Sequence, residues 1–211
     1  MPGFSLYSNE ISIEEKIALA KYLWEKHGKD LAADSEFGRL LGLYRKEISK
    51  SYELMERFGI VAECAMCATQ IQDGGCCGAG IEDWYDEFVV LLNLLLERKI
   101  STERLGEKDC LFLGPTGCQL LARHHFCINY LCLRITDLLS PAKLSDLRAQ
   151  SGKELFLCWQ LERILRTRLN KERTINNLNK LMSFLPSSSL LVDHITRYAR
   201  SSRLEYNKKS Y

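Results

Sequence analysis

Two cysteine-rich stretches decide how this chain folds. The first, residues 64–80, reads CAMCATQIQDGGCCGAG, and the second, residues 109–132, reads DCLFLGPTGCQLLARHHFCINYLC. Together they hold eight of the nine cysteines of the chain, namely Cys64, Cys67, Cys76, Cys77, Cys110, Cys118, Cys127 and Cys132. Glycines and turn-forming residues surround most of them, which is typical of loops shaped around a bound group. We therefore expect the functional centre of the protein in these stretches.

The spacing of the cysteines predicts metal ligation. Cys64 and Cys67 form a CxxC pair, whose two thiolates can reach one ion within a turn of loop. Adjacent Cys76 and Cys77 tend to point apart, so they suit two different sites better than one. Soft thiolates select zinc, iron–sulfur clusters or copper(I). Eight of them fit either two four-thiolate sites or one polynuclear cluster with spare cysteines.

An iron–sulfur cluster, most simply [4Fe–4S], is the metal group that we expect. Zinc modules usually space their thiolates as two compact pairs, whereas the ligands here are scattered, lined by glycine and numerous. Zinc is the alternative. His124 and His125 lie between Cys118 and Cys127, where they either assist the site or simply occupy a solvent-facing loop.

Other uses of the thiols fit the sequence less well. Cys158 lies in an apolar helical segment and is expected in the core, where free cysteines act as small hydrophobic residues. A thioredoxin-type use of Cys64 and Cys67 lacks the strand–CxxC–helix context. An activated nucleophile at Cys127 beside His125 would need a low-pKa thiol. The first ten residues show no secretory signal, so a reducing cytoplasm is expected and disulfides are not.

The periodicity of apolar residues predicts a mainly α fold, namely a helical domain with cysteine-rich metal-binding loops and at most a small β-hairpin. Ser12 and Glu15 form a capping box at the start of the first helix, and Gly28 is expected to end it. The Gly-Pro-Thr-Gly sequence at 114–117 predicts a tight hairpin. We expect helices at residues 12–28, 35–58, 82–99, 142–150, 153–182 and 190–200.

Composition and charge set the limits of this interpretation. The chain has 211 residues, 46% of them hydrophobic and 27% charged, as in soluble globular proteins. We expect an N-terminal helical region at 1–60, the metal-binding region at 61–135 and a C-terminal helical region at 136–211, integrated in one domain. The apolar run FVVLLNLLL at 88–96 is too short to span a membrane and predicts a buried helix.

Charged residues offer two further candidates. Residues 161–211 carry 11 Lys or Arg against 4 Asp or Glu, a balance of +7. This region contains a basic cluster of five residues, namely Arg163, Arg166, Arg168, Lys171 and Arg173. The cluster is a candidate site for nucleic acid or an acidic partner, although no recognised DNA- or RNA-binding motif accompanies it. The carboxylates of Glu82, Asp83, Asp86 and Glu87 fit a solvated helix start better than acid–base catalysis.

The segments CAMC at 64–67, GGCCG at 74–78 and CLFLGPTGCQLLARHHFCINYLC at 110–132 resemble the YkgJ-type cysteine-cluster family, which is described as having a zinc- or iron-chelating domain. The chain departs from the family pattern in two places. Eight residues instead of two separate Cys67 from Cys76, and an Ala-Arg-His-His sequence at 122–125 replaces the usual Arg-Pro before Cys127. The resemblance implies metal ligation by all eight cysteines and no settled reaction.

The sequence therefore predicts a metal-binding cysteine-cluster protein that carries an iron–sulfur cluster, with a redox or cluster-dependent role and a redox or protein partner of unknown identity. The alternative is a structural-zinc interaction or regulatory module, which would use its basic C-terminal helices on nucleic acid. No catalytic residue can be named, so enzymatic activity stays open.

Overall fold

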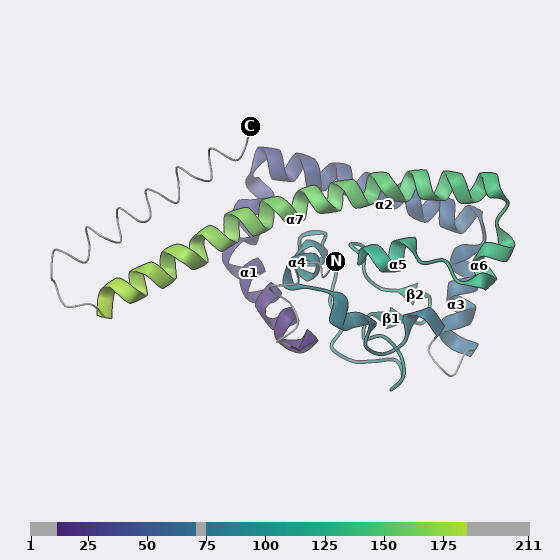
Figure 1. The fold of residues 1–211 in the computed structure, drawn as a ribbon, viewed down its shortest axis with the longest axis horizontal. Coiled ribbons are helices and arrows are strands. Elements are labelled where there is room, and N and C mark those ends of the chain that lie inside the picture. The colour runs from purple at the N-terminus through teal and green to yellow at the C-terminus, as the bar shows by residue number, and fades with distance from the viewer. Residues whose placement is uncertain (1–11, 71–74, 185–211) are drawn as a thin grey trace, which may run out of the picture. The chain divides into compact units, whose positions relative to one another are not determined.

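The computed structural model describes residues 12–70 and 75–184 of the chain (Figure 1). It is mainly helical with one two-stranded antiparallel sheet, which confirms the expected fold class. The chain divides into two compact units, residues 1–166 and 167–211. All nine cysteines belong to the first unit, and the candidate site therefore lies within it. In the second unit, the described backbone continues the last helix to residue 184.

The first two helices are α1, Ile13–Ala33, and α2, Ser35–Arg57. Ser12 Oγ accepts a hydrogen bond from Glu15 N, while Ser12 N donates to Glu15 Oε2 at 2.7 Å. This capping box confirms the expected start of α1. Asp34 Oδ1 accepts from Phe37 N at 2.7 Å and begins α2.

Gly28 does not end α1, contrary to our expectation, because the helix continues to Ala33. Gly28 is buried, and a Cβ atom at this position would lie 3.0 Å from Cδ1 of the Trp24 ring. The glycine thus fits packing inside the helix rather than a helix end. Gly59, by contrast, has a φ of +78° and lies just beyond the end of α2.

The predicted helix at 82–99 is shorter than expected. Residues Ile81–Trp84 form a 3₁₀ helix, η2, and the α-helix α4 spans Glu87–Leu95. Asp86 begins α4 by accepting hydrogen bonds from the backbone N–H groups of Phe88 and Val89, both at 2.9 Å. Almost every side chain of α4 is buried, and α1 packs against it, so α4 forms the centre of the core.

The helix at the end of the described chain is continuous. Helix α7 spans Pro141–Phe184, whereas we expected a break near Gly152. A Cβ at Gly152 would meet nothing within 4 Å, so this glycine does not mark a turn or a close approach. Figure 1 shows the first part of α7 beside α2, and Gln150 Nε2 donates to the Glu47 carboxylate at 2.8 Å and to its backbone oxygen at 3.2 Å.

Shorter elements complete the first unit. Strands β1, Leu113–Gly114, and β2, Gly117–Cys118, pair antiparallel with Leu113 opposite Cys118, which confirms the predicted hairpin. The remaining elements are helix α3 (Ile60–Gln70), the 3₁₀ helix η1 (Gly75–Cys77), helix α5 (His125–Asn129) and helix α6 (Leu133–Leu138).

The predicted helix at 190–200 lies outside the described residues. Within the described residues, no helix combines the length and apolar character needed to cross a bilayer. The run at 88–96 is instead the buried helix α4 and its C-cap, as expected.

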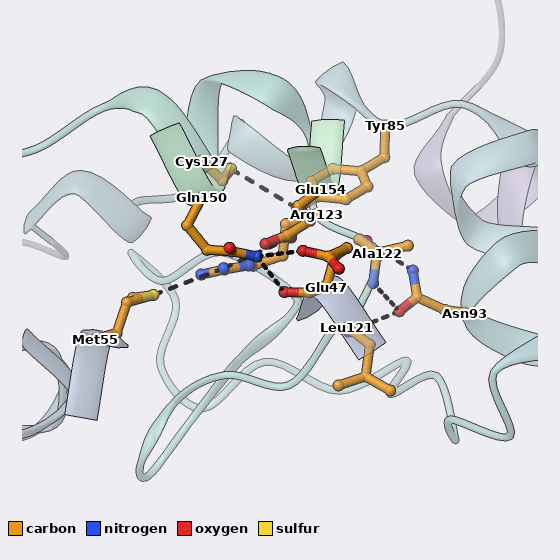
Figure 2. Close-up of polar contacts among 10 residues, drawn as sticks. All are labelled: Glu47, Met55, Tyr85, Asn93, Leu121, Ala122, Arg123, Cys127, Gln150 and Glu154. Carbon is orange, nitrogen blue, oxygen red and sulfur yellow. Dashed lines mark hydrogen bonds and ion pairs between the residues drawn. The ribbon is translucent and has the colours of Figure 1, made fainter. Parts of the chain in front are cut away.

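Asn93 of α4 fixes the loop that follows the hairpin. Its side chain is fully buried, and its Oδ1 accepts hydrogen bonds from the backbone N–H groups of Leu121 and Ala122 at 2.8 and 3.0 Å. Its Nδ2 donates to the backbone oxygen of Ala122 at 2.8 Å (Figure 2) and to that of Val89 at 2.9 Å. One amide therefore satisfies several backbone groups that lie away from water.

We predict that Asn93→Leu lowers the free energy of unfolding by about 3 kcal/mol, because it leaves buried backbone groups at 121 and 122 without partners. Urea unfolding followed by circular dichroism measures this change. The matched control is Asn129→Leu at an exposed position of α5, which should change stability by less than about 0.5 kcal/mol. Equal effects of the two substitutions would contradict this role of Asn93.

Candidate metal centre

Cys64 and Cys67 lie on helix α3 and not in a loop, which corrects the expected loop at 64–80. Their spacing of three residues places both thiols on one face of the helix. Cys64 packs against a hydrophobic cluster formed by residues of α3, α6 and α7 and by Leu139, namely Ile60, Ile135, Leu139 and Leu147. A rigid helix, supported from behind, therefore positions the CxxC pair.

Backbone pairing brings the adjacent cysteines of η1 to Cys110. Cys110 N donates to Cys77 O at 2.7 Å, and Ala79 N donates to Lys108 O at 2.8 Å. Gly78 and Asp109 form an isolated antiparallel bridge between these hydrogen bonds. The two cysteine-rich stretches are thus joined by their main chains next to Cys77.

The hairpin packs against α3 through β2. Gly117 has a φ of +108°, a conformation that L side chains rarely adopt, and a Cβ built there would lie 3.9 Å from Cβ of Cys64. The positive φ therefore accounts for the glycine at this position of β2, which lies beside Cys64 and is followed directly by the exposed Cys118.

The last two cysteines belong to short helices, another departure from the expected loop. Cys127 lies in α5, and Cys132 is the N-cap residue of α6. The buried Tyr85 hydroxyl donates a hydrogen bond to Cys127 Sγ at 3.7 Å. Cys132 joins the hydrophobic cluster that also supports Cys64.

Four cysteines form what we call the first thiol set: Cys64, Cys67, Cys76 and Cys132. They line a hollow of about 20 Å³ together with Glu63, Arg134 and Ile135. Burial raises the pKa of Cys64 to about 11, and the nearby thiols of Cys76, Cys132 and Cys67 add to the rise. The same causes raise the pKa of Cys67, where Cys76 and Cys132 are again the neighbouring thiols.

The other four cysteines of the two stretches form the second thiol set: Cys77, Cys110, Cys118 and Cys127. Burial raises the pKa of Cys110 to about 12, and Cys118 and Cys127 are among the groups that contribute. The pKa of Cys77 is also raised, first by its hydrogen bond with Cys76, then by burial and by the thiols of Cys76, Cys118 and Cys110. Thiols from η1, β2 and α5 therefore lie near Cys110.

Cys76 and Cys77 connect the two thiol sets. Their side chains are hydrogen bonded to each other, yet Cys76 lies beside Cys64 and Cys67 whereas Cys77 lies beside Cys110 and Cys118. Within residues 12–70 and 75–184, no three His, Cys, Asp or Glu side chains form a group that could hold a metal ion. The thiol sets are thus defined by proximity and not by a finished coordination geometry.

Cys158 lies apart from both thiol sets. It is buried in α7, as expected, and its Sγ lies 3.5 Å from Glu162 Oε1. All nine cysteines are free thiols.

Sequence reasoning missed the buried ion pair between Arg123 and Glu154. Arg123 follows the loop that Asn93 fixes, and its guanidinium lies 4.0 Å from the Glu154 carboxylate of α7. The same guanidinium contacts Met55 Sδ at 3.8 Å (Figure 2). The position of Arg123 between Cys118 and Cys127 in the sequence could have identified it as a residue of the site. No feature of the sequence identifies Glu154 as its partner.

The histidines beside Cys127 differ in their surroundings. His124 caps α5, accepting a hydrogen bond at Nδ1 from Phe126 N at 3.3 Å. Burial and the adjacent His125 lower the pKa of His124 to about 4, so its imidazole is neutral at pH 7. His125 is exposed. Burial raises the pKa of Cys127, which does not favour an activated nucleophile there.

The charged candidates have structural partners. Glu82 is buried and paired with Arg104 rather than solvated, and Asp86 caps α4 and pairs with Arg166. Arg166 also lies 3.5 Å from Glu162. One member of the predicted basic cluster is therefore engaged within the first unit, and the side chains of Lys171 and Arg173 lie outside the part of the chain that the structure describes.

Comparison of the chain with protein-family models finds no match, and comparisons with curated proteins and with solved structures find no significant one. The resemblance to the YkgJ-type family therefore stays a prediction.

We predict that Cys76 is the most reactive thiol of the metal-free protein near pH 7. The hydrogen bond from Cys77 lowers the pKa of Cys76 to about 6, so its thiolate fraction should rise through pH 6 and level off by about pH 7.5. Cys64 has a pKa of about 11, so its labelling rate should keep rising as the pH is raised to 10. Iodoacetamide labelling with peptide mass spectrometry measures both profiles.

The control for this pH dependence is Cys77→Ala, which removes the hydrogen-bonding thiol. The midpoint of the Cys76 profile should then move toward the ordinary cysteine range near pH 8.5. Parallel profiles for Cys76 and Cys64 in the unaltered protein would contradict the predicted difference.

Proposed function

We propose that this protein is a metal-binding cysteine-cluster protein in which each thiol set holds one metal centre. The observation that carries the proposal is that Cys64, Cys67, Cys76 and Cys132 line one hollow, while Cys77, Cys118 and Cys127 lie near Cys110. Cys76 also lies near Cys127, so the two groups adjoin each other. Four thiolates are the usual ligand number for a structural zinc ion and for an iron–sulfur cluster.

The chemistry of the donors fits such centres. Thiolates bind soft metals, and several of these thiols have pKa values raised by burial, so that without metal they would be protonated at pH 7. Metal binding would release these protons and join segments that lie far apart in the sequence. The free thiols also suit a reducing cytoplasm, which we propose as the location.

An iron–sulfur cluster, most simply [4Fe–4S], is our first candidate for the bound group, with a redox or cluster-dependent role. When bound, such a cluster would supply one-electron redox chemistry. The chain would supply burial at Cys110, the Tyr85 hydroxyl that donates toward Cys127 Sγ at 3.7 Å, and the charge of Arg123. Hydrogen bonds to sulfur and burial are the usual determinants of cluster potential.

A structural-zinc interaction module is the second candidate. The first thiol set brings the four cysteines Cys64, Cys67, Cys76 and Cys132 around one hollow, and four is the ligand number of a structural zinc site. Zinc is redox-inert and colourless, so the two candidates differ in visible absorption and in their response to reduction. The structure offers no comparable observation for nucleic-acid binding, because Arg166 of the basic cluster is paired with acidic side chains.

Anaerobic purification, followed by metal and acid-labile sulfide analysis and an absorption spectrum near 400 nm, distinguishes the two candidates. Iron, sulfide and a band that bleaches on reduction would support the cluster. Colourless protein with two zinc ions per chain would favour the zinc module. Metal-free protein that folds equally well with all eight cysteines replaced would refute metal binding.

We predict that replacing one thiol set removes about half of the bound metal, because the other set keeps its four ligands. The variants are Cys64→Ala with Cys132→Ala for the first set, and Cys110→Ala with Cys118→Ala for the second. Cys158→Ala is the matched control and should retain all the metal, since Cys158 is buried outside both sets. Metal per chain is measured by elemental analysis.

Complete loss of metal from either double variant, with the fold retained by circular dichroism, would exclude two centres that can each hold metal alone. That result would instead favour one polynuclear cluster shared by both sets.

A further inference from the structure

Tyr85 is buried between segments that supply thiols of the second set. Its side chain is 1% exposed, and its backbone N–H donates to Glu82 O at 3.1 Å at the end of η2. Its ring packs edge-on against Phe112, with 5.0 Å between the ring centroids, and lies 5.8 Å from the ring of His124. Tyr85 therefore joins the segment that follows Cys110 to the residue that begins α5.

The hydroxyl of Tyr85 points to a sulfur atom of the second thiol set. It donates a hydrogen bond to Cys127 Sγ at 3.7 Å (Figure 2). The backbone of His124, the N-cap residue of α5, also lies beside this hydroxyl. Helix α5 has only five residues, and a helix so short depends on tertiary contacts for its position. The buried tyrosine thus attaches the thiol of Cys127 to the core.

The chemistry of this hydrogen bond favours a ligated sulfur over a free thiol. A thiol sulfur is a weak hydrogen-bond acceptor, so a buried hydroxyl gains little from it, whereas phenylalanine would place the same ring without burying a polar group. A thiolate accepts a charge-assisted hydrogen bond, which is about twice as strong as one between neutral groups. The Tyr85 hydroxyl therefore matches the thiolate form of Cys127 better than the thiol form.

The first thiol set is supported in a different way. Cys64 and Cys132 pack against the hydrophobic cluster that contains Ile60 and Ile135. Apolar side chains can fix the position of a ligand, whereas a hydrogen-bond donor also withdraws electron density from its sulfur. The two thiol sets therefore offer a bound metal different electronic surroundings.

We propose that Tyr85 is a positioning residue of the second metal centre, whose hydroxyl holds the Cys127 thiolate in place and withdraws electron density from its sulfur. This inference rests on the proposed metal binding. It makes the two centres inequivalent, because this hydrogen bond acts on a ligand of the second centre. If that centre is a redox cluster, the hydrogen bond raises its reduction potential, since the reduced form carries more negative charge.

The probe that tests this assignment is Co²⁺ alone, which occupies tetrahedral thiolate sites and gives a sulfur-to-metal charge-transfer band in absorption. The full chain is stripped of metal under reducing, anaerobic conditions and titrated with Co²⁺ at pH 7.4. Tyr85→Phe keeps the ring and removes the hydroxyl. The sulfur then holds its electrons less tightly, so the band should move to lower energy, and Co²⁺ binding to the second centre should weaken about tenfold.

Tyr44→Phe is the matched control, because Tyr44 is also fully buried but lies beside Cys158, outside both thiol sets. It should change neither the band nor the affinity. The two double cysteine variants assign the effect to one centre. Tyr85→Phe should shift the band in the double variant that keeps the second thiol set, and it should leave the band unchanged in the double variant that keeps the first.

A second substitution tests the hydrogen bond if Tyr85→Phe does not fold. Replacement of Tyr85 by 3-fluorotyrosine through nonsense suppression keeps the hydroxyl and makes it a stronger donor. The charge-transfer band should then move to higher energy, opposite to the shift expected for Tyr85→Phe. An unchanged band in the fluorinated protein would contradict the proposed role of the hydroxyl.

A band shift to lower energy in Tyr85→Phe that is absent from Tyr44→Phe supports the inference, because a merely structural loss would weaken binding without moving the band. An unmoved band in folded Tyr85→Phe, or an equal shift in the variant that keeps only the first set, would overturn it. If either double variant loses all its metal, the comparison of Tyr85→Phe with Tyr44→Phe in the otherwise unaltered chain decides. Failure of the unaltered protein to bind Co²⁺ would instead reject the proposed function itself.

Discussion

The side-chain amide of Asn93 is the interaction on which the geometry of the site depends. Apart from Glu87 at its start, helix α4 is otherwise apolar, and this one amide hydrogen bonds with the loop at 121 and 122 from inside the core. The loop can therefore cross a hydrophobic region without leaving its backbone groups unpaired. The next residues along the chain, from Arg123 to the thiol of Cys127, take their position from this attachment.

The chain faces a second constraint, because eight ionisable thiols are concentrated in a region that is partly shielded from water. Without metal, burial keeps several of them protonated, as the raised pKa values of Cys64 and Cys110 indicate. The hydrogen bond between Cys76 and Cys77 produces the exception, an acidic thiol at the junction of the two sets. The metal-free site thus combines protonated, inert thiols with one that is ready to react.

Much of this fold could be predicted from local signals. The capping box at Ser12 and the hairpin around Pro115 each follow from a few adjacent residues, and the structure confirms them. The helix boundaries predicted at Gly28 and near Gly152 were wrong. A glycine inside a long helix lowers its stability by only about 1 kcal/mol, which packing can outweigh.

The candidate site was harder to predict than the fold. The composition of the cysteine stretches identified the eight thiols, but it did not show that Cys64, Cys67 and Cys127 lie on helices. The partition into sets depends on the pairing of η1 with residues 108–110, which joins stretches about thirty residues apart and leaves no periodic signal. Glu154 could not be recognised either, because a glutamate in a predicted helix ordinarily faces solvent.

The neighbouring positions of Cys76 and Cys77 have a consequence for how the two centres would fill. These residues share a peptide bond, so any metal that orders the backbone at one of them also orders it at the other. The conformational entropy lost on filling the first centre would then not be lost again at the second. Loading would be cooperative, with empty and doubly filled chains in excess over chains that hold a single metal.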